Sequence, residues 1–235
     1  MWDLRTPRAG FLRMKLLLIR HAESQGNFEH RLQGRREFPL TELGKAQADA
    51  LASRLAELPV SAIYASPIGR AMETAEVIAA KAGLEVVPEP RVQEYDFGEA
   101  VSGRTWDEIR EESPEVVEAM RNNDSEFPRY PGEEGRAAFQ ERVRSALAEL
   151  IERHAGDHIS AIVTHAGPIT VMLLDALARP YSRLIPFVLD NASLTTIEFN
   201  GHESTPRLPP AVVTGINDVC HIDHIQSNDR AGGGA

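Results

Sequence analysis

Short apolar runs alternate along the chain with segments that carry an apolar residue every three or four positions. The runs fit buried strands, and the segments fit helices with one face against a core. The expected strands cover residues 15–19, 62–65, 85–87, 159–163, 195–199 and 211–214, the last two including an edge of the sheet; the expected helices cover residues 41–58, 66–83, 139–151 and 167–178. This alternation predicts an α/β fold, a three-layer α/β/α arrangement around a mostly parallel central sheet.

Capping residues mark several helix ends. Thr41 is placed to cap the first long helix, and Ser66 with Pro67 gives the next helix a cap and a first-turn proline. Gly83 supplies the left-handed residue that ends that helix.

Residues 90–135 break the alternation. This region is charged and interrupted by Pro114, Pro128 and Pro131, with short helical patterns around Trp106 and Val116. We predict a small cap inserted into a domain of residues 14–225. Residues 1–13 contain no apolar stretch typical of a signal peptide and are expected to be a disordered leader, and the Gly-rich residues 226–235 are expected to be a loose tail.

The composition and net charge limit the classes of binding partner that the chain can have. The chain is 42 % hydrophobic and 26 % charged, as in ordinary folded proteins, and its net charge of −10 argues against nucleic acid and anionic membranes as partners. No apolar run reaches the roughly 18 to 20 residues that a membrane span needs. Cys220 is the single cysteine, which favours a reducing compartment and fits the cytoplasm.

Candidate chemistry follows three of the expected strands. Arg20 and His21 follow the first, His165 follows the strand at 159–163, and Arg70 lies in the first turn of the helix after 62–65. Parallel strands end at one edge of a sheet, so two imidazoles and two guanidiniums converge there. A cationic patch in an acidic protein predicts an anion site, and phosphate is the natural ligand.

The residues around these positions resemble a known signature. Leu18 to Ser24, followed by Asn27, is similar to the signature of the histidine phosphatase superfamily, in its phosphoglycerate mutase-like branch. Further blocks agree in order and distance over about residues 14–218: 39–44, 66–75, 94–98, 131–133, 163–167 and 191–193. Ala22 and Ala166 stand where the family usually has glycine; each adds one methyl group and narrows the pocket.

The resemblance implies a set of roles. His21 is expected to attack phosphorus as a neutral imidazole and become phosphohistidine. Arg20, Arg70 and a protonated His165 are expected to hold the phosphate oxygens. Glu94 is expected to protonate the leaving oxygen and then to activate water. The resemblance implies neither a metal nor a cofactor.

Other residues are expected to bind substrate. Asn27 adds a neutral hydrogen bond in the family pattern. Arg31, Gln33, Arg35 and Arg36 follow the first strand and either line the mouth of the site or form a solvated loop. Asn27, Gln33 and Ala166 are our candidate substrate-binding residues.

A phosphatase fits the chain better than a mutase does. A mutase must hold a second acidic group, and the family's mutases typically carry a tyrosine where this chain has Phe97, with paired arginines in the cap that are absent here. Residues 131–133 resemble phosphatases of the α-ribazole phosphatase and broad-specificity type.

We therefore predict a phosphomonoester hydrolase that acts on a small phosphorylated metabolite. Two alternatives stay open: a phosphoglycerate mutase, and a protein-directed phosphohistidine phosphatase or phospho-binding module. A homodimer is also left open.

Two further motifs are set aside. His221, Asp223 and His224 suggest a metal site by composition, but so close to the chain end we expect a solvated tail. Cys220 lacks an arginine six positions later, where Gln226 stands, so the loop of a cysteine phosphatase is excluded.

Overall fold

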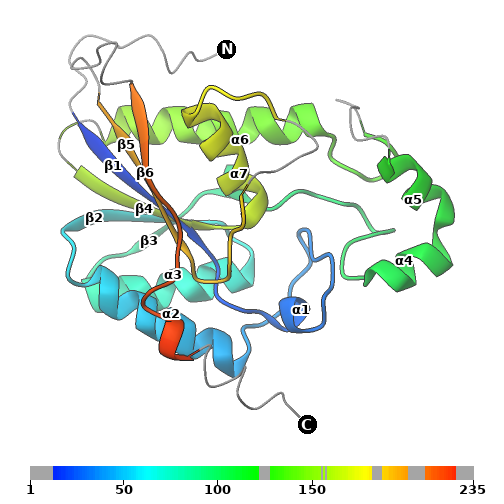
Figure 1. Cartoon of the computed structure of the whole chain (residues 1–235), viewed down its shortest axis with the longest axis horizontal. Helices are drawn as coiled ribbons and strands as arrows, with labels where there is room; N and C mark the ends of the chain where they lie inside the picture. Colours follow the sequence, from blue (N-terminus) through cyan, green and yellow to red (C-terminus); the bar gives the residue numbers. More distant parts are fainter. Residues whose placement is uncertain are drawn as a thin grey trace.

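A six-stranded sheet forms the centre of the computed structural model (Figure 1), with the order β3-β2-β4-β1-β5-β6. The strands are β1 (Met14–Arg20), β2 (Val60–Ala65), β3 (Val86–Pro88), β4 (His158–Thr164), β5 (Leu194–Phe199) and β6 (Ala211–Asp218). The first four run parallel, whereas β5 pairs antiparallel with β1, and β6 with β5. The mostly parallel sheet is confirmed; β6 lies at an edge and β5 lies inside.

The structure describes residues 13–121, 128–154, 156, 158–181, 187–200 and 210–225. The predicted leader, apart from Arg13, and the predicted tail at 226–235 lie outside the described residues.

Helices cover both faces of the sheet, giving the three layers seen in Figure 1. α2 (Glu42–Leu55) and α3 (Gly69–Ala82) cover one face, and α6 (Arg136–Arg153) and α7 (Ala166–Ala176) cover the other. Each face has its own apolar cluster, one built around Leu51 and Ile78 and the other around Phe139 and Leu173.

The neighbouring strands β1 and β4 form a topological switch point. The first long helix after β1 along the chain, α2, packs on one face, and the helix that follows β4, α7, packs on the opposite face. Ligands of open α/β sheets bind beyond the carboxyl ends of strands at such a point, because the two connections diverge and leave a crevice. Arg20 and Thr164 pair across this position as the last residues of their strands.

The predicted helix ends are right in two cases and wrong in one. The Thr41 hydroxyl accepts the backbone N–H of Gly44 at 2.9 Å, and Gly83 ends α3 with a φ of 67°. The predicted cap at Ser66 is wrong: α3 begins at Gly69, after Ile68 as the capping residue. The Ser66 hydroxyl instead lies 2.8 Å from the ring of His165, ninety-nine residues away.

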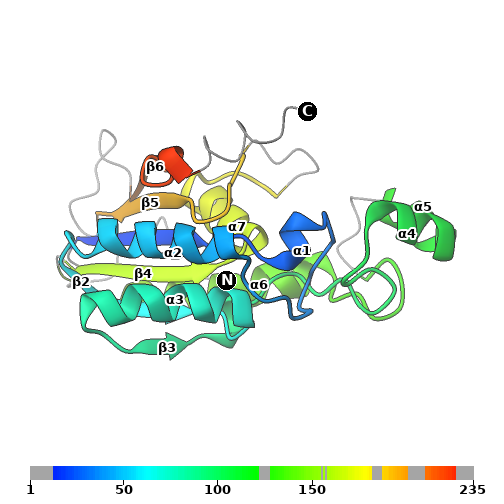
Figure 2. The ribbon, with the colours of Figure 1, turned by 90° about the horizontal axis from the view of Figure 1, so that it is seen from below.

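Two short helices project from the sheet beyond its carboxyl edge (Figure 2). These are α4 (Trp106–Glu112) and α5 (Pro114–Arg121), and they match the helical patterns expected around Trp106 and Val116. They enclose a small apolar cluster of their own, centred on Val101, Ile109, Val116 and Tyr130. The term cap below refers to residues 90–135; these boundaries remain our proposal. A 3₁₀ turn, η1 (Pro90–Val92), begins the cap, and α1 (Gln25–Phe28) follows β1.

The last described residues dock on the main body. Ile222 is fully buried in the cluster under α2, and the His221 ring donates from Nε2 to the carbonyl of Ala192 at 3.0 Å while accepting from Arg54. The expectation of a solvated tail is therefore wrong for His221, because an apolar neighbour anchors this turn.

Two searches of the described residues were negative. They contain no helix long and apolar enough to cross a membrane, and no group of three or more His, Cys, Asp or Glu side chains arranged to hold a metal ion.

Candidate active site

His21 lies at the end of β1 and is fixed by neighbours on both sides. Its N–H donates to the carbonyl of Thr164 at 2.8 Å, and its carbonyl accepts from Ala192 N at 3.1 Å and Asn191 Nδ2 at 3.0 Å. The next residue, Ala22, donates to Thr74 Oγ1 on α3. The imidazole is only 3 % exposed, so its backbone and ring are both held rigidly.

The hydrogen bonds of His21 define its tautomer. Nδ1 lies 2.8 Å from the carbonyl of Ala22, which can only accept, so Nδ1 carries the proton. Nε2 accepts from Nε of Arg70 at 3.1 Å and therefore holds a lone pair. Burial and the charges of Arg70 and Arg20 lower the pKa of His21 well below 6.5. The ring is neutral at pH 7, as an attacking nitrogen requires.

Arg70 stands against this lone pair. Its guanidinium is 1 % exposed and also donates to the carbonyls of Arg36 at 2.9 Å and Gly34 at 2.7 Å. Burial lowers the pKa of Arg70 to about 10, so it stays cationic at neutral pH. The bond to His21 means that a bound anion must draw the Arg70 Nε–H to itself before Nε2 can attack.

Two further donors complete the cationic cluster. Arg20 donates through Nη1 to the carbonyl of Leu189, but its buried Nε finds no hydrogen-bond partner among the described residues. Nδ1 of His165 is likewise buried without such a partner in the described chain. A buried polar group without a bond costs about 1–3 kcal/mol, so both atoms favour a ligand that accepts hydrogen bonds.

His165 packs edge-on against His21, with ring centroids 5.1 Å apart. Ser66 accepts from Ile68 N and can donate to His165 Nε2, which leaves the ring proton on Nδ1. Burial, together with Arg70, His21 and Arg20, lowers the pKa of His165 well below 6.5. The expected protonated imidazole is therefore wrong for the free site: His165 is a neutral donor, and only an incoming anion would favour its charge.

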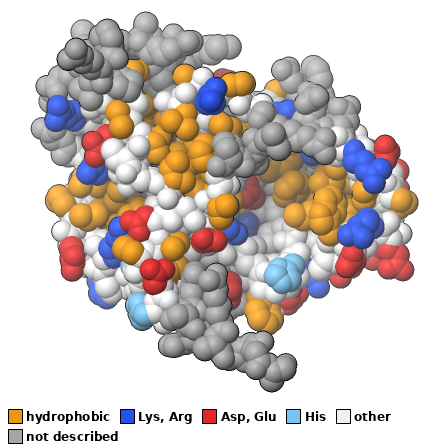
Figure 3. Space-filling model, in the orientation of Figure 1, with side chains coloured by type: hydrophobic (Ala, Val, Ile, Leu, Met, Phe, Trp, Pro, Cys, Tyr) orange, Lys and Arg blue, Asp and Glu red, His pale blue; other side chains and the backbone are white. Residues whose placement is uncertain are grey.

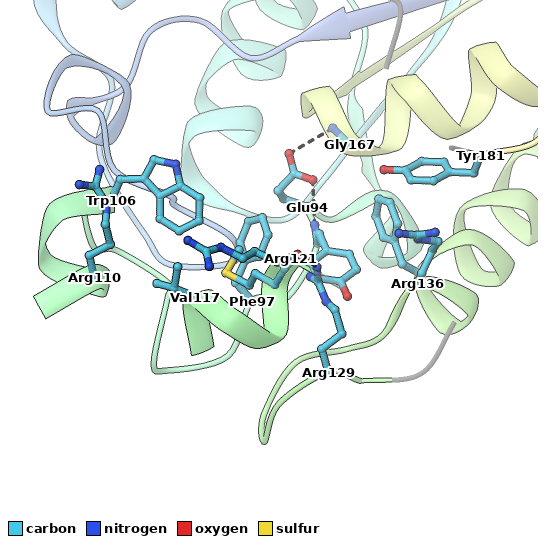
Figure 4. Close-up of a pocket in the computed structure, with 13 residues that line it drawn as sticks. Glu94, Phe97, Trp106, Arg110, Val117, Arg121, Arg129, Arg136, Gly167 and Tyr181 are labelled. Atoms are coloured by element: carbon cyan, nitrogen blue, oxygen red, sulfur yellow. Dashed lines mark hydrogen bonds between the residues drawn. The ribbon is translucent and has the colours of Figure 1, made fainter. Parts of the chain in front are cut away.

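Glu94 faces the same site from the first residues of the cap. Its carboxylate accepts from its neighbour Tyr95 N at 2.8 Å and from Gly167 N in the first turn of α7 at 3.2 Å (Figure 4). Its negative charge favours the cationic forms of both Arg20 and Arg70. The structure thus brings together all five predicted catalytic residues: Arg20, His21, Arg70, Glu94 and His165.

The three candidate substrate-binding residues lie nearby in different settings. Asn27 Oδ1 accepts from Ser24 N at 3.2 Å and from Asn191 Nδ2, so a ligand contact would come from its Nδ2. Gln33 is 8 % exposed and accepts from the Ser24 hydroxyl at 2.8 Å, which makes it a support of the Asn27 turn. Ala166 begins α7, and its methyl group packs toward the core.

The arginines after β1 connect this loop to the cap. Arg31 donates to the carbonyl of Gly103 and to Glu108, Arg35 pairs with Glu134, and Arg36 donates to the carbonyl of Ser102. Their guanidiniums therefore act as links to the cap, where the sequence left a choice between the mouth of the site and a solvated loop.

A cavity of about 720 Å³ extends from Glu94 under the cap. Five aromatic side chains line it in a chain that is only 6 % aromatic: Tyr95, Phe97, Trp106, Phe139 and Tyr181. Figure 3 shows the hollow, with hydrophobic side chains gathered on its cap side and basic side chains near its rim. Arg110, Arg121, Arg129 and Arg136 contribute the positive charge.

Sequence reasoning missed the residues that orient the others. Ser66 and Thr74 lie in matching blocks but bond to His165 and to the Ala22 N–H. Arg142 had no signal beyond its place on a polar helix face, yet it donates to the carbonyl of Glu94 at 2.9 Å. These partners are distant in sequence, so no local pattern reports them.

Known proteins share this arrangement. The sequence profile described as "Histidine phosphatase superfamily (branch 1)" matches residues 16–208. The chain belongs to the histidine phosphatase superfamily. The matched span includes every residue of the cationic cluster and Glu94.

Relatives within the superfamily carry different names. "Phosphoserine phosphatase 1" of Hydrogenobacter thermophilus is 33 % identical over 209 residues, covering 89 % of this chain and 94 % of that protein. "Probable phosphoglycerate mutase GpmB" of Escherichia fergusonii is 31 % identical over 210 residues, covering 89 % and 95 %. The crystal structure of a putative alpha-ribazole-5'-P phosphatase from Escherichia coli superposes with a TM-score of 0.77 at 26 % identity, covering 88 % of this chain and 97 % of that one.

The two buried imidazoles of this histidine phosphatase predict how its stability depends on pH. Because the folded state keeps His21 and His165 neutral, the unfolded state binds more protons once the pH falls below about 6.5. Their contribution to the free energy of unfolding should therefore be fully present above pH 6.5 and should be lost as the pH is lowered toward the depressed pKa values of the folded state. Urea denaturation at pH 7.5 and 5.5 measures this slope.

A matched pair of variants isolates the cause. His165→Asn should reduce the loss of stability between pH 7.5 and 5.5. His30→Asn should leave it unchanged, since His30 is exposed and its left-handed φ of 54° suits asparagine. Equal slopes in all three proteins would contradict the assignment.

Proposed function

We propose that this chain hydrolyses phosphomonoesters of small metabolites through a phosphohistidine at His21, without a metal. One observation carries the proposal: a neutral imidazole with its Nε2 lone pair turned to Arg70 lies beside two buried donors, Arg20 Nε and His165 Nδ1, that lack partners among the described residues. Three donor groups around one nucleophile match the three oxygens of a phosphoryl group in transfer. Phosphatase names among the relatives support the same conclusion.

The first chemical step forms a nitrogen–phosphorus bond. His21 Nε2 attacks phosphorus, the phosphorus–oxygen bond to the leaving group breaks, and Glu94 gives its proton to the departing oxygen. Arg20 and Arg70 offset the charge on the three transferred oxygens, which is where electrostatic catalysis acts most strongly. His165 donates a hydrogen bond and can take on charge as the oxygens gain it.

The second step reverses the role of the carboxylate. Glu94 takes a proton from a water molecule as the water oxygen attacks phosphorus and the nitrogen–phosphorus bond breaks. Inorganic phosphate leaves, neutral His21 is restored, and Glu94 is again protonated. A positioned acid or base of this kind contributes about 10²- to 10⁴-fold to the rate.

The cavity favours an organic group with apolar surface as the rest of the substrate. Its aromatic walls lie beyond Glu94, on the side where the leaving group departs (Figure 4). A volume of about 720 Å³ falls within the range of sites for small organic ligands. Cap residues such as Trp106 and Val117 line one side of the cavity, which disfavours a folded protein as substrate.

A phosphoglycerate mutase is the second candidate, favoured by the arginines of the cavity and by a relative's name. A mutase needs cations free to hold a carboxylate, but Arg110 pairs with Asp107, Arg121 with Glu118 and Arg129 with Glu133. Phosphate release from 3-phosphoglycerate, against isomerisation in the presence of bisphosphoglycerate, separates the two activities.

Location in the cytoplasm and assembly as a homodimer remain predictions.

The nucleophile assignment has a direct test. His21→Ala should abolish turnover of p-nitrophenyl phosphate and the acid-labile ³²P label that a brief incubation with labelled substrate leaves on the protein. The thermal unfolding curve confirms that the variant folds. Turnover or labelling that survives the substitution would rule out phosphohistidine at this position.

A substitution at Gly167 tests how precisely the carboxylate of Glu94 must be positioned. A methyl group on Gly167 would lie 2.1 Å from Glu94 Oε1, so Gly167→Ala must displace the carboxylate. We expect about a tenfold or larger fall in kcat/KM, which reports the step that forms the phosphohistidine, for alkyl phosphates, which need protonation of the leaving oxygen, and a smaller fall for p-nitrophenyl phosphate. Gly215→Ala is the control, because no atom lies within 4 Å of its new methyl group. Equal losses on both substrates would contradict this placement.

A further inference from the structure

Arg142, on α6, uses all five of its N–H groups at one place. Nη1 donates to the carbonyls of Arg91 and Gln93, each at 2.7 Å, and Nη2 donates to the carbonyl of Glu94 at 2.9 Å. The remaining two donors, on Nε and Nη2, bind the carboxylate of Glu134. The side chain is 16 % exposed, so these bonds are largely shielded from water.

The segment that Arg142 binds has no regular structure of its own. Residues 93–98 lie in neither a helix nor a strand, so no ladder of backbone hydrogen bonds fixes the position of Glu94. Glu134 adds a second attachment, because its Oε2 accepts from Asp96 N at 3.2 Å and its N–H donates to the carbonyl of Asp96 at 3.0 Å. Arg35 Nη2 also donates to Glu134 Oε1, at 3.0 Å.

The same contacts keep Arg142 away from the carboxylate that reacts. Its donors are consumed by carbonyls and by Glu134, whereas the Glu94 carboxylate accepts from the backbone N–H groups of Tyr95 and Gly167. A salt bridge from Arg142 to Glu94 would hold that carboxylate ionised and oppose proton donation. The guanidinium therefore fixes the backbone of Glu94 and leaves its side chain free to exchange a proton.

We propose that Arg142, supported by Glu134, is a positioning residue that holds the proton donor Glu94 at the leaving-group side of the site. The inference rests on the proposed function, since it assigns Arg142 a task only if Glu94 acts as the acid. A planar fork that reaches three carbonyls cannot be replaced by an ammonium group, so arginine is specifically required.

The test compares two substrates and four variants. Arg142→Lys keeps the charge but loses the fork, and it should lower kcat/KM for an alkyl phosphate about 10- to 100-fold while changing kcat/KM for p-nitrophenyl phosphate far less. Glu134→Gln replaces one acceptor oxygen and removes the negative charge at constant size, which weakens the side-chain part of the second attachment, and it should shift the ratio of the two rates in the same direction. If Arg142→Lys fails to fold, Glu134→Gln alone decides the proposal.

Arg144→Lys is the matched control. Arg144 lies on the same helix and binds Asp175 through two nitrogens, away from Glu94. This variant should keep the wild-type ratio, and all folded variants should keep the wild-type inhibition constant for inorganic phosphate, which reports the cationic cluster. A wild-type ratio in folded Arg142→Lys, or an equal fall on both substrates, would overturn the positioning role.

Glu94→Gln separates this proposal from the one before it. Selective loss on the alkyl phosphate in Glu94→Gln but not in the Arg142 and Glu134 variants overturns only the positioning role. No selectivity in Glu94→Gln overturns the assignment of the acid, and the role of Arg142 falls with it.

Discussion

Two buried guanidinium groups that have no hydrogen-bonded carboxylate partner among the described residues set the character of this site. Arg70 is held by two carbonyls and an imidazole, and Arg20 by one carbonyl. Removing a cation from water costs several kcal/mol, and carbonyl dipoles offset only part of that cost. Glu94 and Glu37 favour the charges from a distance. The fold therefore maintains a positive potential in a chain of net charge −10, and an oxyanion is the ligand that lowers its energy most.

The same charges also prepare the nucleophile. Burial, together with Arg70 and Arg20, lowers the pKa of His21, so the groups that attract a phosphate also help to keep the attacking nitrogen unprotonated. Anion affinity and nucleophilicity are thus linked, and a change to either arginine alters both. The neutral state of His165 follows from burial and the same charges, which makes this second imidazole sensitive to the arrival of the anion.

The sequence predicts the parts of this molecule that depend on local patterns. An apolar run followed by His21, and a helix start carrying Arg70, place both residues at one sheet edge once the strands are parallel. Ser66 is not the helix cap that the sequence predicts, because its partner, His165, follows a different strand. Local patterns do not predict the roles of Arg142 and His221 either. Arg142 acts on carbonyls about fifty residues away, and His221 is held by a buried neighbour in a segment too short to give an apolar period.

The contacts around His21 connect segments near the two ends of the described chain. β1 pairs with β4 and β5, and the carbonyl of His21 accepts from Ala192, whose own carbonyl accepts from His221. During synthesis the nucleophile leaves the ribosome first, but the groups that fix its orientation follow some 170 to 200 residues later. Contacts between residues so far apart in the sequence also form slowly. Because the late residues are required, the enzyme acquires a competent site only when nearly the whole chain has been made. A nascent or truncated chain contains Arg20, His21 and Arg70 but lacks the later residues that hold them in a catalytically competent arrangement.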